Sequence, residues 1–268
     1  MDAIEIENLT KNYNGTAAVD SINLRIKQAE LFGLLGPNGA GKTTMISMLS
    51  TILKPSSGNA KINGINISYQ NSVRKLIGIV FQDPSLDDEL TGMENLTFHS
   101  KLYHMPHELS KKRINDVLKL VDLEGKSKML VKTYSGGMKR RLEIARGLLH
   151  HPKILFLDEP TLGLDPQTRR HIWEYIKKLN KEEKITIILT THYMEEADYL
   201  CKRIAIIDHG KIVALGTPKK LKSSISSVKK PTLEDVFIHL TGRKIREDEA
   251  SDKERLKSMM RQVGWRRR

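Results

Sequence analysis

The stretch Gly36-Pro37-Asn38-Gly39-Ala40-Gly41-Lys42-Thr43 decides the fold, because it matches the pattern G-x-x-x-x-G-K-[ST] of a phosphate-binding loop, the Walker A motif. Its glycines allow successive backbone N–H groups to close around phosphate oxygens, and a helix that begins near Lys42 adds the positive end of its dipole. The ammonium of Lys42 would balance phosphate charge, and the hydroxyl of Thr43 is a ligand suited to Mg²⁺. A glycine-rich turn that matches by chance is the alternative, and the surrounding sequence argues against it.

The residues around this loop predict a parallel sheet covered by helices. The apolar run 31–35, directly before the loop, is typical of a strand buried on both faces. After Ser135 the chain alternates helices with apolar strands over 154–157 and 185–189, and this order predicts a mainly parallel sheet. A closing hairpin is expected over 203–215. The predicted fold class is therefore α/β, with a mainly parallel core that carries the phosphate-binding loop.

Two further units are expected beside this core. Alternating apolar residues and the hairpin signal Asn63-Gly64 predict a small antiparallel sheet in the N-terminal region. Residues 83–133 become helical, with capping-box spacing at Thr91-x-x-Glu94, and predict an inserted helical subdomain. We expect one domain over 1–217 and a C-terminal extension over 218–268.

The end of that extension is strongly basic. Residues 243–268 hold ten Lys or Arg and five Asp or Glu, and the spacing Ser251-x-x-Glu254 predicts a terminal helix. Such a helix would contact an anionic membrane surface or the partner subunit, and a solvated chain end is the alternative.

Composition narrows the class of protein. With 268 residues, 39% hydrophobic and 29% charged, the chain is typical of a water-soluble globular protein, and it has no apolar run of the roughly 18 to 20 residues that a membrane span requires. The absence of a secretory signal and the single cysteine, Cys201, fit a protein of the reducing cytosol. A net charge of +13 favours acidic partners such as nucleotides, nucleic acids or anionic lipids.

An acidic pair follows the predicted strand over 154–157. Asp158 and Glu159 would lie at the carboxyl end of a buried strand, which is where open α/β sheets bind ligands. Asp158 can then reach the Mg²⁺ shell, and Glu159 can orient and polarise a water molecule. The alternative is an acidic pair that merely ends a strand and begins a turn, which the upstream phosphate-binding loop makes the weaker interpretation.

The segment Ser135-Gly136-Gly137, at the start of a predicted helix, is a second anion site. This segment is similar to the signature motif of ATP-binding cassette (ABC) transporters. With the phosphate-binding loop and the acidic pair in this order and spacing, the chain resembles the nucleotide-binding subunit of such a transporter. The resemblance covers residues 4–216 and implies the fold of a P-loop NTPase (ABC ATPase) with a RecA-like, mainly parallel core. It implies that two copies of the chain sandwich two Mg·ATP head to tail, with the signature of one copy serving the nucleotide of the other. A P-loop small-molecule kinase would leave this segment unexplained.

Four more residues match positions of that family. Gln82 resembles the Q-loop residue that touches Mg²⁺ or the attacking water, and His192 resembles the switch histidine of the γ-phosphate. Asp165 resembles the D-loop residue at the dimer interface, and Tyr13 the aromatic that stacks on adenine. A polar strand end for Gln82, an ordinary core or surface histidine for His192, and plain sheet surface for Tyr13 are the alternatives.

The resemblance thus implies three sets of site residues. The catalytic residues are Glu159, His192, Gln82 and Lys42. The Mg²⁺ ligands are Thr43, Gln82 and Asp158. The residues that contact ATP are Tyr13, Gly36, Pro37, Asn38, Gly39, Ala40, Gly41, Lys42, Thr43, Thr44, Ser135, Gly136, Gly137 and Asp165.

Two departures from the commonest family pattern point to one branch. Tyr134 and Met138 stand where many members carry Leu and Gln, and with residues 232–237 they resemble the daunorubicin-resistance-type (ABC-2) exporter ATPases. We therefore expect an ATP-hydrolysing subunit that dimerises with ATP and powers an exporter through a separately encoded membrane permease. Such a subunit would be cytoplasmic and held at the inner face of the cell membrane by that permease.

A non-transport ABC-family ATPase acting on nucleic acid or ribosomes is the alternative, which the positive net charge keeps open. Chromosome-maintenance relatives insert a long coiled coil between loop and signature, whereas here about 92 residues without a heptad array separate Thr43 from Ser135. Translation-factor relatives carry two cassettes in one chain, and this chain has one. A nucleic-acid partner is therefore not expected.

Overall fold

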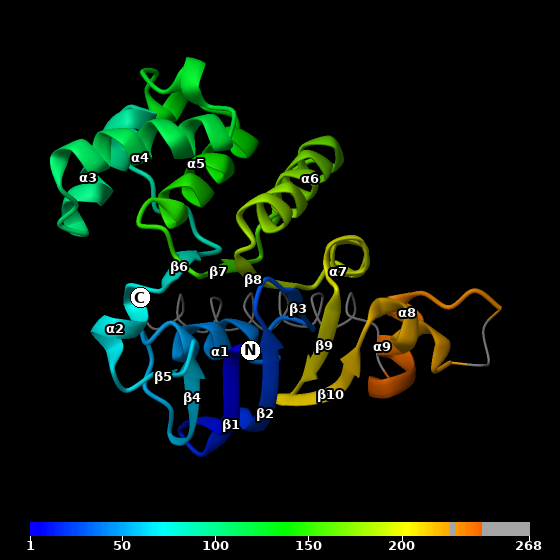
Figure 1. The fold of residues 1–268 in the computed structure, drawn as a ribbon. Coiled ribbons are helices and arrows are strands. Elements are labelled where there is room, and N and C mark those ends of the chain that lie inside the picture. The colour runs from blue at the N-terminus through cyan, green and yellow to red at the C-terminus, as the bar shows by residue number, and fades with distance from the viewer. Residues whose placement is uncertain (226–228, 243–268) are drawn as a thin grey trace, which may run out of the picture.

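The computed structural model describes residues 1–225 and 229–242, which form two sheets, a group of helices over the second sheet and two short C-terminal helices (Figure 1). One hydrophobic cluster lies between the two sheets around α1 (Lys42–Leu49). A second cluster lies on the other face of the larger sheet, beneath the helices. The larger sheet is therefore buried on both faces, as the apolar runs in its strands predict.

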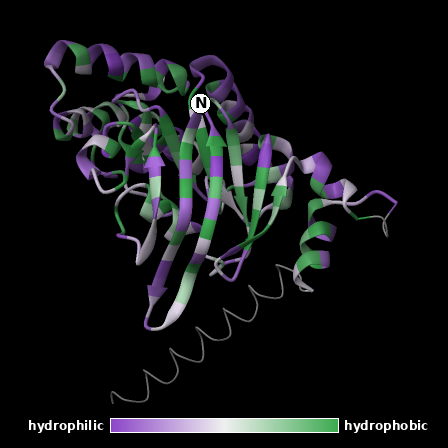
Figure 2. Cartoon of the chain, turned by 60° about the horizontal axis from the view of Figure 1, so that its bottom comes forward, coloured by the Kyte–Doolittle hydropathy of each residue, from purple (hydrophilic) through white to green (hydrophobic). Residues whose placement is uncertain are grey.

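The smaller sheet is antiparallel, in agreement with the sequence. Its strand order is β2-β1-β4-β5, from β1 (Asp2–Tyr13), β2 (Thr16–Lys27), β4 (Ser57–Ile62) and β5 (Ile65–Asn66). Asn63 and Gly64 join the last two strands with φ of 47° and 78°, the left-handed values that this hairpin turn needs. Figure 2 shows apolar and polar residues alternating along the two long strands, whose apolar positions face the core.

The larger sheet has the order β10-β9-β3-β8-β7-β6, with only β10 antiparallel to its neighbour. The predicted mainly parallel core is therefore confirmed. Its strands are β3 (Leu31–Leu35), β6 (Ile77–Val80), β7 (Ile154–Asp158), β8 (Thr186–Thr191), β9 (Arg203–Asp208) and β10 (Lys211–Gly216). The phosphate-binding loop, Gln82, Glu159 and His192 follow four parallel strands, so all of them lie at the same edge of the sheet.

Helices form most of the segment between β6 and β7. A short α2 (Gln70–Arg74) precedes β6, and the Thr91–Glu94 capping box begins α3 as predicted. The helices of this segment are α3 (Gly92–Leu102), α4 (His107–Leu120), the 3₁₀ turns Glu124–Lys126 and Val131–Thr133, and α5 (Gly136–Leu148). Helix α5 contacts α3 and α4 on one side and β6 on the other, so it joins the helical segment to the sheet.

The C-terminal region packs on the core more closely than its composition suggests. Helices α6 (Pro166–Glu183) and α7 (Met194–Leu200) cover the sheet, α8 (Pro218–Ser223) contacts β10, and α9 (Leu233–Thr241) contacts α7. A capping box between Thr232 and Asp235 begins α9, whose apolar face is buried in the main core. The domain boundary at 217/218 stays a prediction, and the proposed terminal helix of 251–264 lies outside the described residues.

In the ranges described above, we find no helix with the length and apolar character needed to cross a lipid bilayer.

Candidate functional site

The phosphate-binding loop runs from β3 into α1 through positions where a side chain would collide. Gly41, the N-cap of α1, has a φ of 105°, and a Cβ there would lie 2.3 Å from the carbonyl oxygen of Ala18. A Cβ on Gly36 would lie 2.3 Å from the carbonyl oxygen of Ile207. The backbone therefore needs glycine at both points to leave its N–H groups open at the start of α1.

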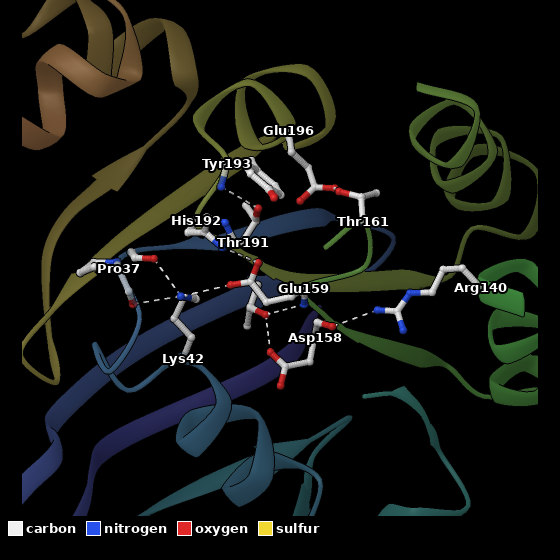
Figure 3. Close-up of polar contacts among 12 residues, drawn as sticks. Pro37, Lys42, Arg140, Asp158, Glu159, Thr161, Thr191, His192, Tyr193 and Glu196 are labelled. Carbon is white, nitrogen blue, oxygen red and sulfur yellow. Dashed lines mark hydrogen bonds and ion pairs between the residues drawn. The ribbon is translucent and has the colours of Figure 1, made fainter. Parts of the chain in front are cut away.

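Lys42 is the first residue of α1, and its ammonium folds back over the loop. Its side chain is buried, and Nζ donates hydrogen bonds to the carbonyl oxygens of Gly36, at 2.8 Å, and Pro37, at 3.0 Å. The same Nζ lies 3.2 Å from Glu159 Oε1 (Figure 3). A buried ammonium with one carboxylate partner is available to bind phosphate oxygens.

Glu159 lies at the centre of the polar cluster that Figure 3 shows. Its Oε2 is 2.9 Å from Nδ1 of His192, and because a carboxylate only accepts, this nitrogen must carry the proton. Burial raises the pKa of Glu159, but the hydrogen bond from His192 and the charge of Lys42 outweigh it, so the pKa lies below its usual range. Glu159 is therefore ionised at neutral pH and able to accept a proton or hydrogen bond from water.

The backbone of Glu159 is strained. Its φ is 47°, a left-handed value that non-glycine residues adopt at a cost of about 1 kcal/mol or more. Thr190 holds the strained residue, because its hydroxyl accepts from the Glu159 N–H at 3.0 Å and donates to Asp158 Oδ1. The turn directs the Glu159 carboxylate toward Lys42, while Asp158 stays almost fully buried at the end of β7.

A cavity of about 690 Å³ lies over the loop and brings many of the predicted residues together. Gln82, Glu159 and His192 line it together with most of the phosphate-binding loop and Thr44. The sequence did not identify three other lining residues, Ala18, Leu162 and Tyr193. Ala18 has no chemical signature, whereas Tyr193 directly follows His192 and Leu162 lies three residues after Glu159.

Ser135 and Gly137 line a different cavity, of about 440 Å³, against α6. The Ser135 hydroxyl accepts from the Met138 N–H at 3.2 Å and so caps α5. A Cβ on Gly137 would lie 2.5 Å from the Thr168 methyl group, so this residue allows α5 to approach α6 closely. Tyr134 is buried and its hydroxyl donates to the Lys126 carbonyl oxygen at 2.7 Å, which explains a tyrosine in place of leucine.

Two predicted nucleotide contacts lie away from the loop cavity. The carboxylate of Asp165 is the N-cap of α6 and accepts from the Gln167 and Thr168 N–H groups, both at 3.0 Å. Tyr13 is 47% exposed at the end of β1, beneath the Lys11 ammonium at 5.4 Å, and does not line the cavity. The loop cavity thus brings together the four residues predicted to be catalytic and most of the phosphate-binding loop. The Ser135–Gly137 segment lies apart from it, and adenine stacking by Tyr13 stays a prediction.

The predicted metal ligands offer the right donor chemistry. Thr43 and Gln82 line the cavity and carry a hydroxyl and an amide oxygen. Asp158 carries a carboxylate, but it is almost fully buried at the end of β7 and does not line the cavity. These are the hard oxygen donors that Mg²⁺ prefers. Among the residues with defined positions, no group of three or more His, Cys, Asp and Glu could hold a metal. An ion here would therefore complete its shell with water and substrate phosphates, as Mg²⁺ usually does.

Comparison with known proteins identifies the family. The profile of the family described as ABC transporter matches residues 19–162. The linearmycin resistance ATP-binding protein LnrL of Bacillus subtilis is 44% identical over 89% of this chain and 74% of its own. The daunorubicin/doxorubicin resistance ATP-binding protein DrrA of Streptomyces peucetius is 44% identical over 84% of this chain and 68% of its own.

A solved structure supports the same family assignment. The dimeric ATP-binding cassette MJ0796 in a post-hydrolysis state, bound to ADP and phosphate, superposes with a TM-score of 0.70 and 31% identity, over 80% of this chain and 98% of that one. The chain therefore belongs to the ABC transporter family, as an ATP-binding and ATP-hydrolysing subunit. These relatives favour the transport interpretation over the one in which the ATPase acts on nucleic acid or ribosomes.

Proposed function

We propose that this chain powers an exporter of the drug-resistance type, by closing as a head-to-tail dimer around two ATP molecules. The observation that carries the proposal is the division of the predicted site between two cavities: the phosphate-binding loop, Glu159 and His192 line one, and Ser135 and Gly137 line the other. A second copy of the chain would bring its own Ser135 segment to the nucleotide held by the loop of the first.

The catalytic residues would act by position and charge. Lys42 would balance the charge of the β- and γ-phosphates, and the ionised Glu159 would orient a water molecule for in-line attack. His192 donates to Glu159 and would hold the carboxylate in place while the γ-phosphate is lost. Such electrostatic preorganisation supplies most of the rate in phosphoryl transfer.

Magnesium would be held by Thr43, Gln82 and Asp158, with water and the phosphates completing its shell, and would supply neutralisation of the developing phosphate charge. The four hydrogen-bonding groups of Lys42, Glu159, His192 and Thr190 are arranged by the protein itself. We therefore assign the positioning of water to this chain and only the charge neutralisation to the ion.

Transport would require a separate permease, since the described helices include none that crosses a bilayer. The subunit would then be cytoplasmic, at the inner face of the cell membrane. The helical segment 83–133 would pass the movement of closure to the permease, because α5 joins that segment to β6 next to Gln82. The names of LnrL and DrrA support drug-like molecules as cargo.

Crosslinking tests the dimer directly. In a Cys201→Ser background, Asn38→Cys in one copy and Ser135→Cys in another should be joined by a short bifunctional reagent only when ATP is present. A control pair with Glu108→Cys, whose exposed side chain lies at the start of α4, should not react. Absence of the ATP-dependent product would refute head-to-tail closure.

A further inference from the structure

Arg140 is a buried arginine on α5, one helical turn after the Ser135–Gly137 segment. Its guanidinium donates to three main-chain carbonyl oxygens, those of Pro160 at 2.7 Å, Phe81 at 2.7 Å and Asp158 at 2.9 Å. It also pairs with Glu143 Oε2 at 2.9 Å. Figure 3 shows it reaching from α5 to the end of β7. A single side chain thus binds three segments that are far apart in the sequence.

The three carbonyls belong to the segments that carry the chemistry. Asp158 and Pro160 directly flank Glu159, and Phe81 directly precedes Gln82. Arg140 therefore fixes the peptide groups on both sides of Glu159, whose φ of 47° requires support from its surroundings.

Helix α5 also binds Ser85, at the other end of the segment 81–85 that contains Gln82. The Ser85 N–H donates to Glu143 Oε1 at 3.0 Å, and Arg146 donates to the Ser85 carbonyl oxygen at 2.6 Å. Arg140, Glu143 and Arg146 are spaced three residues apart and so lie on one face of α5. Residues 81–85 are consequently held at both ends by the helix that begins at Ser135.

We propose that Arg140 is a positioning residue that ties the Ser135–Gly137 end of α5 to Glu159 and Gln82 of the same chain. The inference rests on the proposed function, in which this end of α5 grips the nucleotide of the partner copy. Nucleotide binding at this end of α5 would then fix the positions of the Glu159 carboxylate and the Gln82 amide in the same chain. The two ATP molecules of the dimer would be hydrolysed cooperatively, because each site is completed through the α5 that binds the other nucleotide.

A planar, always charged guanidinium suits this role. It offers five N–H donors in a fixed fork, so it can bind several carbonyls at defined angles, which an ammonium cannot do. Burying such a charge is costly, and within the described part of the chain the ion pair with Glu143 compensates it. A simple packing role at this position would be filled by an uncharged residue at lower cost.

The double variant Arg140→Gln/Glu143→Gln tests the proposal without leaving a buried carboxylate unpaired. We expect the ATP dissociation constant to stay within about twofold, because the loop and Lys42 are untouched, while kcat falls at least about tenfold, since small misplacements of catalytic groups cost up to about 100-fold. The Hill coefficient for ATP should fall toward one. Thermal unfolding, measured in parallel, shows whether the variant is folded.

Arg140→Lys answers the same question if the double variant does not fold. It keeps the charge and one carbonyl contact but loses the fork, so kcat should lie between those of wild type and the double variant, with ATP affinity unchanged. The matched control is Arg113→Gln on α4, because Arg113 binds the carbonyl oxygens of Leu148 and Leu149 at the other end of α5. This control should keep wild-type kcat and cooperativity.

Wild-type kcat and Hill coefficient in a folded Arg140 variant would overturn the inference. Loss of kcat in Arg113→Gln as large as in the Arg140 variants would also overturn it, because any weakening of α5 would then suffice. Failure of the proposed function is seen separately, as a wild-type protein that neither hydrolyses ATP nor forms the Asn38–Ser135 crosslink.

Discussion

Two buried glutamates near the end of the parallel sheet have opposite electrostatics. Glu159 faces Lys42 and His192, and its pKa is lowered although burial alone would raise it. Glu196 on α7 is completely buried and accepts from the Thr161 hydroxyl and the Trp173 indole, both at 2.7 Å. Burial raises the pKa of Glu196, and its neutral donors offset this only in part.

The comparison shows that partners rather than burial decide the charge. A carboxylate beside an ammonium stays ionised and can act on water, whereas one beside neutral donors is favoured in its protonated form. Thr161 joins the two regions, since it follows the Glu159 turn by two residues and binds Glu196. We therefore assign the orientation of water to Glu159, and support of the turn at Glu159 to Glu196.

The largest effect is expected from Glu159→Gln. This change keeps the shape of the side chain but removes the charge that orients water, so kcat should fall about 10²- to 10⁴-fold. ATP should still bind, and the variant should accumulate as a nucleotide-bound dimer on size-exclusion chromatography. As a contrasting control, Lys42→Ala should lose ATP binding itself. Turnover of Glu159→Gln near the wild-type rate would show that this carboxylate has no catalytic role.

A smaller effect, on stability rather than turnover, is expected from Glu196→Ala. The indole N–H of Trp173 and the hydroxyl of Thr161 would lose their acceptor, and unsatisfied buried groups cost about 1–3 kcal/mol each. We expect the free energy of unfolding in urea to fall by about 2–4 kcal/mol. Glu196→Gln keeps an acceptor oxygen and should lose less than half of this. Equal losses in both variants would contradict this role, because they would show that the acceptor oxygen kept in Glu196→Gln does not stabilise the fold.

The smallest effect is a pair of opposite pH dependences. The lowered pKa of Glu159 adds stability that is present above its unfolded pKa of about 4.3 and is lost as pH falls through the folded value. The raised pKa of Glu196 adds stability that is present below about pH 4.3 and is lost as pH rises through the folded value.

Unfolding in urea between about pH 3 and pH 8 measures both dependences. The difference in unfolding free energy between wild type and Glu159→Gln should grow with pH, whereas that between wild type and Glu196→Gln should shrink. Differences of the same sign for the two variants would contradict the electrostatic contrast between these residues.

Patterns that are contiguous in sequence predicted the fold well. The run before the phosphate-binding loop, the Asn63-Gly64 turn and the Thr91 capping box each act within a few residues, and the structure has each where it was expected. The docking of α8 and α9 was missed, because α8 has one buried apolar residue among lysines and α9 is only nine residues long. Their burial depends on contacts with α7 and β10, and the few residues around each helix in the sequence give no sign of these contacts.

The site divides in the same way. The structure brings Lys42, Gln82, Glu159 and His192 to one cavity because each belongs to a segment that follows a parallel strand, and that placement is readable from sequence. Arg140 and Glu196 were not singled out. The main-chain partners of Arg140 lie 18 to 59 residues away, and the neutral partners of Glu196 lie 23 to 35 residues away. Nothing in residue type marks such contacts in advance.

The ion pair between Lys42 and Glu159 has a consequence for the end of each catalytic cycle. Under the proposed function, the Glu159 carboxylate would act as an internal substitute for phosphate, because it lies 3.2 Å from the same ammonium. Departure of the γ-phosphate would then leave Lys42 paired with Glu159 rather than isolated as a buried charge. Product release would in this way exchange one counterion of Lys42 for another.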